Sequence, residues 1–237
     1  MKNDPELKIV ESWKRNASPW IRAVRENEID SRILVTNKAI VDAVLSQSPK
    51  KVLDIGCGEG WLVRTLSENG IDVLGVDVVS EFIESAKLYN VGRYQLLGYD
   101  QLSSHSLGEK FDVLVCNFSL FGLESVEGIF RSAKNLLQPG GSLTIQTLHP
   151  KTILAEKEAV EGWAEGSWSG FSSEFCDPAP WYRRSIGNWI ELFIAFGFEE
   201  PEIIEPVNPK TENFASIVFI GKYAANKALH PTQKPRG

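Results

Sequence analysis

The stretch VLDIGCGEGW, residues 52–61, constrains the fold more than any other part of this chain, because an apolar run leads into an acid and three closely spaced glycines. Glycine lacks a Cβ, so the main chain can turn tightly there and approach a bound ligand. A glycine-rich turn between a strand and a helix is typical of nucleotide-binding α/β folds, whose ligands lie at the carboxyl ends of parallel strands. The stretch therefore predicts an α/β protein with a ligand site at this turn.

Two classes of ligand are compatible with such a turn. The dinucleotide-binding fingerprint is G-x-G-x-x-G, whose third glycine allows a helix to pack closely on the strand. Here Gly56, Gly58 and Gly60 are followed by the large Trp61, which disfavours a dehydrogenase. Asp77 ends the next apolar run, VLGVD, where a carboxylate can accept hydrogen bonds from both ribose hydroxyls of an adenosine. The pattern therefore indicates an adenosine ligand.

Four segments in this order, VLDIGCGEG, GVD, FDVLVCNFSLFGL and AKNLLQPGGSLTIQTLHP, together resemble the class I S-adenosylmethionine-dependent methyltransferases. The resemblance is good over about residues 35–150 and weak elsewhere. It implies that S-adenosylmethionine is the cofactor, S-adenosylhomocysteine its product, and an oxygen, nitrogen or carbon atom of a small molecule the methyl acceptor. The alternative is a non-catalytic protein that binds the same cofactor as a regulatory or assembly partner.

The order of the predicted elements supports this fold class. Apolar runs alternate with amphipathic segments through residues 52–148, which predicts a doubly wound, mostly parallel sheet. The resemblance further implies that this sheet is Rossmann-like, has seven strands and ends in an antiparallel pair. We expect a small helical cap at residues 1–34, the methyltransferase domain at 35–223 and a flexible tail at 224–237. An aromatic-rich insert at about 150–184 is expected to form a lid, since long inserts are commonly lids or binding segments; fixed packing of a cap is the alternative.

Composition favours a protein that acts on a small molecule. With 237 residues, 43% of them hydrophobic, the chain can bury a sizeable core. The net charge of −6, with acids and bases mixed along the chain, provides no basic stripe for nucleic acid. The polar first residues and the lack of a long apolar stretch predict neither a signal peptide nor a membrane span. We therefore expect a cytoplasmic monomer or homodimer that binds neither nucleic acid nor membrane.

The resemblance assigns cofactor contacts around the first two predicted strands. Asp54 would receive the ammonium group of the methionine part directly or through water, and Asp77 would hold the ribose. Val78 would lie against the adenine, with ordinary core packing as the alternative. The full set assigned there is Asp54, Gly56, Cys57, Gly58, Gly60, Asp77 and Val78, in which Cys57 contributes its backbone and no thiol chemistry.

Three other segments are expected to complete the cofactor site. Tyr99 or Asp100 would face the adenine amino group, and the sequence leaves this register open by one residue. Asn117 and Phe118 end the fourth strand and would border the methionine group and the methyl. Arg32 could hold the cofactor carboxylate through a bidentate pair, although a solvated position on a helix is the alternative.

The chemistry implied is a displacement at a sulfonium methyl, for which the protein supplies alignment, exclusion of water and sometimes a base. No metal is expected, because the three histidines share no metal-ligand spacing. His149 could take a proton from the acceptor, and a hydrogen-bonded loop histidine is the alternative. Tyr182 could orient the acceptor, and Arg183 beside it would favour an anionic substrate. NFSL at residues 117–120 lacks the prolines of the [DN]-P-P-[YFW] stretch, which argues against methylation of base amino groups.

Overall fold

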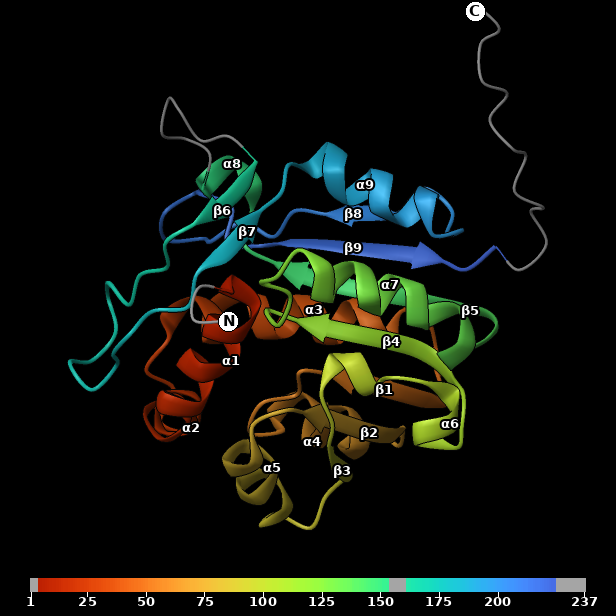
Figure 1. The fold of residues 1–237 in the computed structure, drawn as a ribbon, viewed down its shortest axis with the longest axis horizontal. Helices are drawn as coiled ribbons and strands as arrows, with labels where there is room; N and C mark the ends of the chain where they lie inside the picture. Colours follow the sequence, from red (N-terminus) through yellow and green to blue (C-terminus); the bar gives the residue numbers. More distant parts are fainter. Residues whose placement is uncertain (1–3, 154–160, 225–237) are drawn as a thin grey trace, which may run out of the picture.

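The computed structural model describes residues 4–153 and 161–224, so the predicted tail beyond residue 224 lies outside the described residues. Seven strands form one sheet in the order β3-β2-β1-β4-β5-β9-β8 (Figure 1). They are β1 (Lys51–Ile55), β2 (Asp72–Asp77), β3 (Arg93–Leu96), β4 (Phe111–Asn117), β5 (Leu137–Thr147), β8 (Glu202–Ile204) and β9 (Ile217–Lys222). The pairs from β3 to β5 are parallel, whereas β9 runs antiparallel to both β5 and β8. The predicted doubly wound sheet of seven strands is therefore confirmed.

Helices cover both faces of this sheet. They are α1 (Pro5–Arg15), α2 (Ala17–Arg25), α3 (Asn37–Leu45), α4 (Trp61–Glu68), α5 (Ser80–Lys87), α6 (Ser104–Leu107), α7 (Glu124–Leu136), α8 (Pro150–Ile153) and α9 (Ile186–Ala195), together with the π-helix η1 (Arg32–Thr36) and the 3-10 helix η2 (Tyr99–Gln101). None of the helices in the described ranges is long and apolar enough to cross a membrane.

Alternation along the central strands divides the core into two layers. Leu53 and Ile55 of β1 pack on one face with α7 and α9, whereas Val52 faces α3 and α4 on the other. Successive side chains of a strand point to opposite faces, so strands buried on both sides need apolar residues throughout. The runs VLDI and DVLVC are apolar apart from Asp54 and Asp112, which suits these strands to the centre of the sheet.

The first helices lie at the edge of the sheet where the parallel strands end (Figure 1). The Glu6 carboxylate on α1 accepts hydrogen bonds from the backbone N–H groups of Leu123 (2.7 Å) and Glu124 (2.9 Å). It thereby caps the N-terminus of α7, where a negative charge is favourable. The boundary expected between residues 34 and 35 falls inside a continuous helical segment, because η1 runs directly into α3.

The insert packs on these helices through a buried polar contact. Asn16, fully buried between α1 and α2, accepts a hydrogen bond from Cys176 N–H (2.9 Å) and donates one to the Cys176 carbonyl (2.8 Å). Ser12 Oγ donates to the Asp177 carbonyl (2.6 Å). The insert also contains the two-stranded sheet of β6 (Gly162–Ala164) and β7 (Trp181–Arg183), so it is partly regular and not only a loop.

Candidate active site

The glycine turn joins β1 to α4 at the carboxyl edge of the sheet. Gly56, Gly58 and Gly60 all have positive φ, at 75°, 54° and 85°. A Cβ on Gly56 would lie 2.5 Å from Ser119 Cβ, so glycine is required there for packing. A Cβ on Gly58 would make only an ordinary van der Waals contact, with the Trp20 indole nitrogen 4.0 Å away. Space thus limits Gly58 less than Gly56, and Trp20 of α2 lies over this part of the turn.

Asp54, the last acid before the turn, is buried in the sheet. Its side chain is 1% exposed, and Oδ1 has no hydrogen-bond partner among the described residues. Burial, assisted by the nearby Asp77 carboxylate, raises the pKa of Asp54 to about 8. A buried carboxylate with an unused oxygen is suited to a cationic ligand group, since an opposite charge would offset its loss of hydration.

Arg32 supplies the opposite charge near the same turn. Its guanidinium lies over the rings of Trp61 (4.8 Å) and Trp20 (6.0 Å), and Nη2 is buried without a hydrogen-bond partner in the described part of the chain. Burial lowers the pKa of Arg32 to about 10, so the group stays charged at neutral pH. The sequence left open a solvated position for Arg32, but in the structure its Nη2 atom is buried. A fixed, unpaired guanidinium is a suitable donor for a carboxylate.

Asp77, at the end of β2, holds the turn in place. Its two carboxylate oxygens accept hydrogen bonds from Gly58 N–H (2.9 Å) and Val79 N–H (2.9 Å). Each oxygen keeps a second lone pair that could accept a ligand hydroxyl. The Cys57 backbone, expected to touch the cofactor, is used within the turn, because its N–H donates to Val76 and its carbonyl accepts from Gly60.

Val78 and Asp100 both lie beside Gly98. Val78 is 39% exposed, so it is not ordinary core. A Cβ on Gly98 would lie 3.6 Å from Val78 Cγ2 and 2.6 Å from Asp100 Oδ1, which places both side chains at Gly98. Asp100 is exposed, whereas the Tyr99 hydroxyl donates to the Ser119 carbonyl (3.0 Å). The sequence left open whether Tyr99 or Asp100 faces the ligand, and this geometry favours Asp100 for a ligand beside Val78.

The end of β4 combines an unpaired polar atom with a strained backbone. Asn117 Oδ1 is buried without a hydrogen-bond partner among the residues described. Phe118 has φ of 51°, an uncommon value for a bulky residue, and its N–H donates to the Gln146 carbonyl (2.8 Å). Backbone strain of this kind gathers at functional sites. Both residues therefore lie where the sequence placed them, at the carboxyl edge between β1 and β5.

His149 follows β5 but is enclosed by protein. The ring is 1% exposed, stacks on Phe214 at 4.2 Å, and accepts a hydrogen bond from Lys151 N–H at Nδ1 (3.1 Å). Nε2 therefore carries the proton and donates it to Glu205 (2.9 Å). Neither nitrogen is free to take a proton from a substrate in this arrangement. The structure thus supports the hydrogen-bonded loop histidine, the alternative to a catalytic base.

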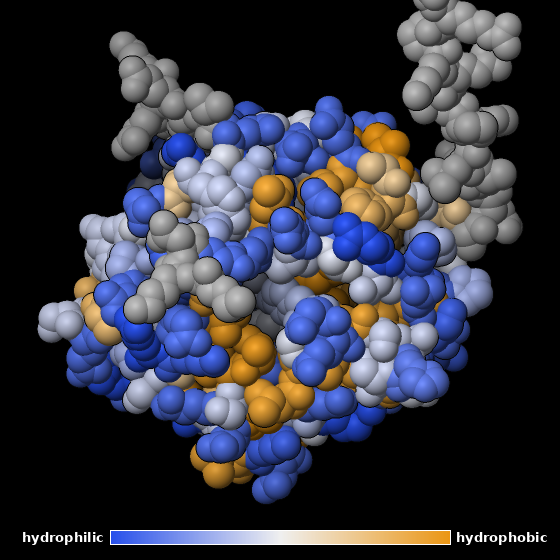
Figure 2. Space-filling view, viewed as in Figure 1, coloured by the Kyte–Doolittle hydropathy of each residue, from blue (hydrophilic) through white to orange (hydrophobic). Residues whose placement is uncertain are grey.

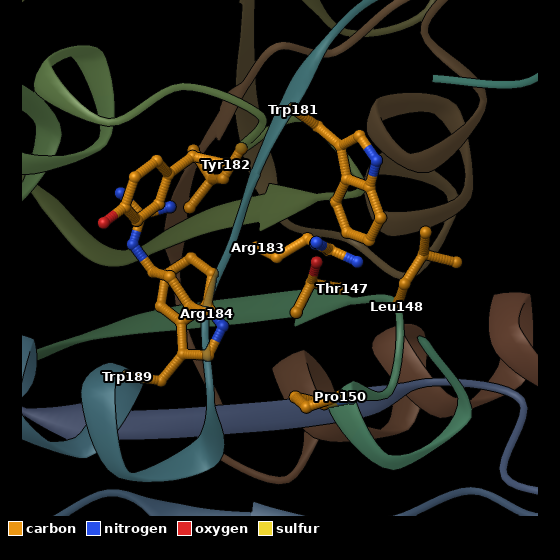
Figure 3. Close-up of a pocket in the computed structure, with 9 residues that line it drawn as sticks. Thr147, Leu148, Pro150, Trp181, Tyr182, Arg183, Arg184 and Trp189 are labelled. Carbon is orange, nitrogen blue, oxygen red and sulfur yellow. The ribbon is translucent and has the colours of Figure 1, made fainter. Parts of the chain in front are cut away.

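Tyr182 lines a cavity at the ends of β4 and β5, together with residues of the insert (Figure 3). Its backbone N–H donates to the Phe121 carbonyl (2.7 Å), which ties β7 to the loop after β4. The surface on this side of the molecule is hollowed near its centre, with both hydrophilic and apolar residues around the hollow (Figure 2). The cavity is lined by Leu120, Thr147, Leu148, Pro150, Trp181, Tyr182, Arg183, Arg184 and Trp189.

Two features of the site were not predicted from the sequence. Trp20 covers Gly58 from a distant helix, and no local pattern marks it. Glu59, inside the glycine turn, is 1% exposed and pairs with Arg64 (2.7 Å) and, from α2, with Arg25 (3.5 Å). An acid within such a turn could have suggested an internal ion pair. This pair fixes the turn against α2 and thereby helps to position Trp20.

Comparison with known proteins assigns the chain to a family. A family model described as a methyltransferase domain matches residues 30–199. The chain belongs to the methyltransferase domain family. The "Ubiquinone biosynthesis O-methyltransferase" of Haemophilus ducreyi is 33% identical over 121 residues, which is 48% of this chain and 51% of that protein. The chain spans about half the length of the curated relatives it matches.

Solved methyltransferase structures have the same fold. A putative S-adenosylmethionine-dependent methyltransferase from Listeria monocytogenes gives a TM-score of 0.62 at 19% identity, covering 78% of this chain and 98% of that one. The 1,6-didemethyltoxoflavin-N1-methyltransferase of Burkholderia thailandensis was solved with 1,6-didemethyltoxoflavin and S-adenosylhomocysteine. It gives a TM-score of 0.56 at 20% identity, covering 85% of this chain and 81% of that one. At these identities the likeness establishes the fold of the methyltransferase domain.

Proposed function

We propose that this protein transfers the methyl group of S-adenosylmethionine to a small-molecule acceptor. The observation that carries the proposal is the pair of buried, unpartnered polar atoms at the glycine turn, Asp54 Oδ1 and Arg32 Nη2. An α-amino acid presents an ammonium and a carboxylate together, so the methionine part of the cofactor complements both. A nicotinamide dinucleotide has no ammonium group to pair with Asp54, although its pyrophosphate could meet Arg32.

The other site residues suit the rest of the cofactor. Asp77 would accept the ribose hydroxyls while it holds the turn, and Val78 with Asp100 would border the adenine. Asn117 and Phe118 would lie beside the sulfonium, next to the cavity at the ends of β4 and β5. The cofactor supplies the reactive methyl when bound, and this chain's residues align the acceptor and exclude water. The H. ducreyi relative and the Burkholderia enzyme, both named as methyltransferases, support the assignment.

Calorimetry with the purified full chain tests the cofactor assignment. We expect saturable binding of S-adenosylhomocysteine and none of NAD, and a loss of affinity in Asp54→Asn and Arg32→Met. Incubation with labelled S-adenosylmethionine and a metabolite extract, followed by mass analysis, tests the transfer. Binding of NAD but not of S-adenosylhomocysteine would refute the proposal, and cofactor binding without any methylated product would favour a non-catalytic protein.

A further inference from the structure

Trp20 of α2 presents a hydrogen-bond donor to the glycine turn. A Cβ placed on Gly58 would lie 4.0 Å from the Trp20 indole nitrogen, and apart from the adjoining turn residues no other described atom would come within 4 Å of it. The indole can only donate, and its N–H forms no hydrogen bond to any residue within 4–153 and 161–224. The ring itself is partly buried. Trp20 therefore covers the turn with a donor that the described residues leave unused.

Arg32 brings a second unused donor to the same place. Its guanidinium lies over the rings of Trp20 (6.0 Å) and Trp61 (4.8 Å), and Trp61 directly follows Gly60 at the end of the turn. Its Nη2 atom is buried without a hydrogen-bond partner in the part of the chain that the structure describes. The proposed function assigns this guanidinium to the cofactor carboxylate. Because a carboxylate has about four lone pairs available to donors, Arg32 alone does not use its full capacity.

A buried ion pair holds α2, and with it Trp20, against the turn. Arg25 lies five residues beyond Trp20 on α2; its Nε pairs with Glu59 (3.5 Å), and its Nη2 donates to Ser85 Oγ (2.6 Å). Glu59 belongs to the turn itself and is 1% exposed, and its two oxygens also accept from Arg64 Nη2 (2.9 and 2.7 Å). A buried carboxylate between two guanidinium groups has little freedom to move. The position of Trp20 over the turn is therefore set in part by the contacts of Arg25.

We propose that the Trp20 indole N–H donates to the cofactor carboxylate beside Arg32. Arg25 positions Trp20 for this contact through its pair with Glu59. The inference rests on the proposed function, because it adds two residues to the part of the site that receives the methionine carboxylate. Two donors aimed at one carboxylate favour a ligand that has this group over one that lacks it, since both would otherwise stay unpaired. The N-terminal helices would thus select the amino-acid end of the cofactor.

Displacement calorimetry with the full chain tests the role of Trp20. It compares S-adenosylhomocysteine with its decarboxylated analogue, which keeps the adenosine, the thioether and the ammonium group. Trp20→Phe removes the N–H but keeps an aromatic ring against Trp13 (5.1 Å) and Phe171 (6.1 Å). We expect this variant to bind S-adenosylhomocysteine about tenfold or more weakly, the value of a hydrogen bond to a charged group. Its affinity for the decarboxylated analogue should stay close to that of the wild type.

Trp13→Phe is the matched control, because it makes the same change within the same aromatic cluster. The Trp13 ring packs against four protein rings and should not affect the preference for the carboxylate; these rings are Trp20, Phe82, Phe121 and Trp168. An equal loss of affinity for both ligands in Trp20→Phe would overturn the inference, because the ring would then only cover the site. A preference that Trp20→Phe leaves intact would overturn it as well.

Variants of Arg25 test the positioning role. Arg25→Met should reduce the preference for the carboxylate, whereas Arg25→Lys, which keeps a cation opposite Glu59, should retain most of it. Arg22→Met removes a cation from the same helix, where its partner Glu174 is 55% exposed, and should leave the preference unchanged. Arg25 is 30% exposed, so its variants remain informative if Trp20→Phe does not fold. An unchanged preference in Arg25→Met would refute its positioning role, whereas failure of the wild type to bind S-adenosylhomocysteine would refute the proposed function instead.

Discussion

Replacing Asp54 by Asn should make the ligand-free protein more stable and the cofactor complex weaker. Asn has nearly the same shape as the acid but never ionises, so it removes the cost of a negative charge in the sheet. The same charge is the proposed partner of the cofactor ammonium. A residue that is kept for binding at the expense of stability is expected at a functional site.

The magnitude follows from the pKa of Asp54, which burial raises from an ordinary value near 3.8 to about 8 in the folded protein. Because the unfolded chain releases this proton first, stability is greatest below about pH 4 and falls as the pH rises toward 8. At pH 7 the difference corresponds to about 3 pKa units, or about 4 kcal/mol as an upper bound, since relaxation and water entry reduce such costs. The free energy of unfolding of Asp54→Asn should not show this fall with rising pH, because the amide does not ionise.

Urea denaturation of ligand-free protein at pH 5, 7 and 9 measures the effect. The gap in unfolding free energy between Asp54→Asn and wild type should widen from pH 5 to 7 and level off above about 8. Asp42→Asn, which removes a carboxylate 58% exposed on α3, serves as the control and should show no such trend. A gap that is the same at all three pH values would refute the reasoning, because an Asp54 with the same pKa in the folded and unfolded chain gives no pH dependence.

Three further changes test other parts of the site. Arg32→Met should weaken S-adenosylhomocysteine binding by about tenfold or more in calorimetry, the value of a lost charged hydrogen bond, and an unchanged Kd would mean that the carboxylate lies elsewhere. His149→Gln should lower the free energy of unfolding by about 1–3 kcal/mol through its lost contacts while turnover persists; a large fall in kcat at unchanged stability would restore the catalytic base. Asn16→Ala should speed hydrogen exchange at residues 168–177, because the paired bonds to Cys176 are lost, and unchanged exchange there would show that the aromatic contacts alone hold the insert.

The sheet could be predicted from the sequence because its causes are local. The apolar runs of β1 and β4, the glycines after β1 and the acid at the end of β2 each occupy a few neighbouring residues. The same is true of Asp54 and Asp77, whose place at strand ends follows from the parallel order. The antiparallel β9 was predictable as a strand, although its position between β5 and β8 depended on the family resemblance.

The contacts that complete the site could not be predicted in this way. Asn16 meets Cys176 across 160 positions of the sequence, and Glu6 caps α7 from more than 110 positions away. No periodicity links such residues, because their proximity depends on how α1 and α2 pack against the finished sheet. His149 illustrates the same limit, since its partners Glu205 and Phe214 lie beyond the insert and decide whether its nitrogens are free.

The N-terminal helices and the insert form one cover over the site, which bears on how a ligand enters. Trp13 of α1 packs against Trp168 of the insert (5.7 Å), and Trp20 against Phe171 (6.1 Å), around the fully buried Asn16. Opening the insert alone would break the Asn16 bonds to Cys176 and expose these rings together. Displacing α1, α2 and the insert as a unit would preserve them, but would release Glu6 from α7 and Arg25 from Glu59. It would also separate Ala17 and Trp13 from Val79 and Phe82. Glu59 is 1% exposed and Ala17, Val79 and Phe82 are buried, so this movement also uncovers buried groups. Either movement breaks buried contacts, so the lid expected at about residues 150–184 stays a prediction, which hydrogen exchange of the insert with and without S-adenosylhomocysteine would test.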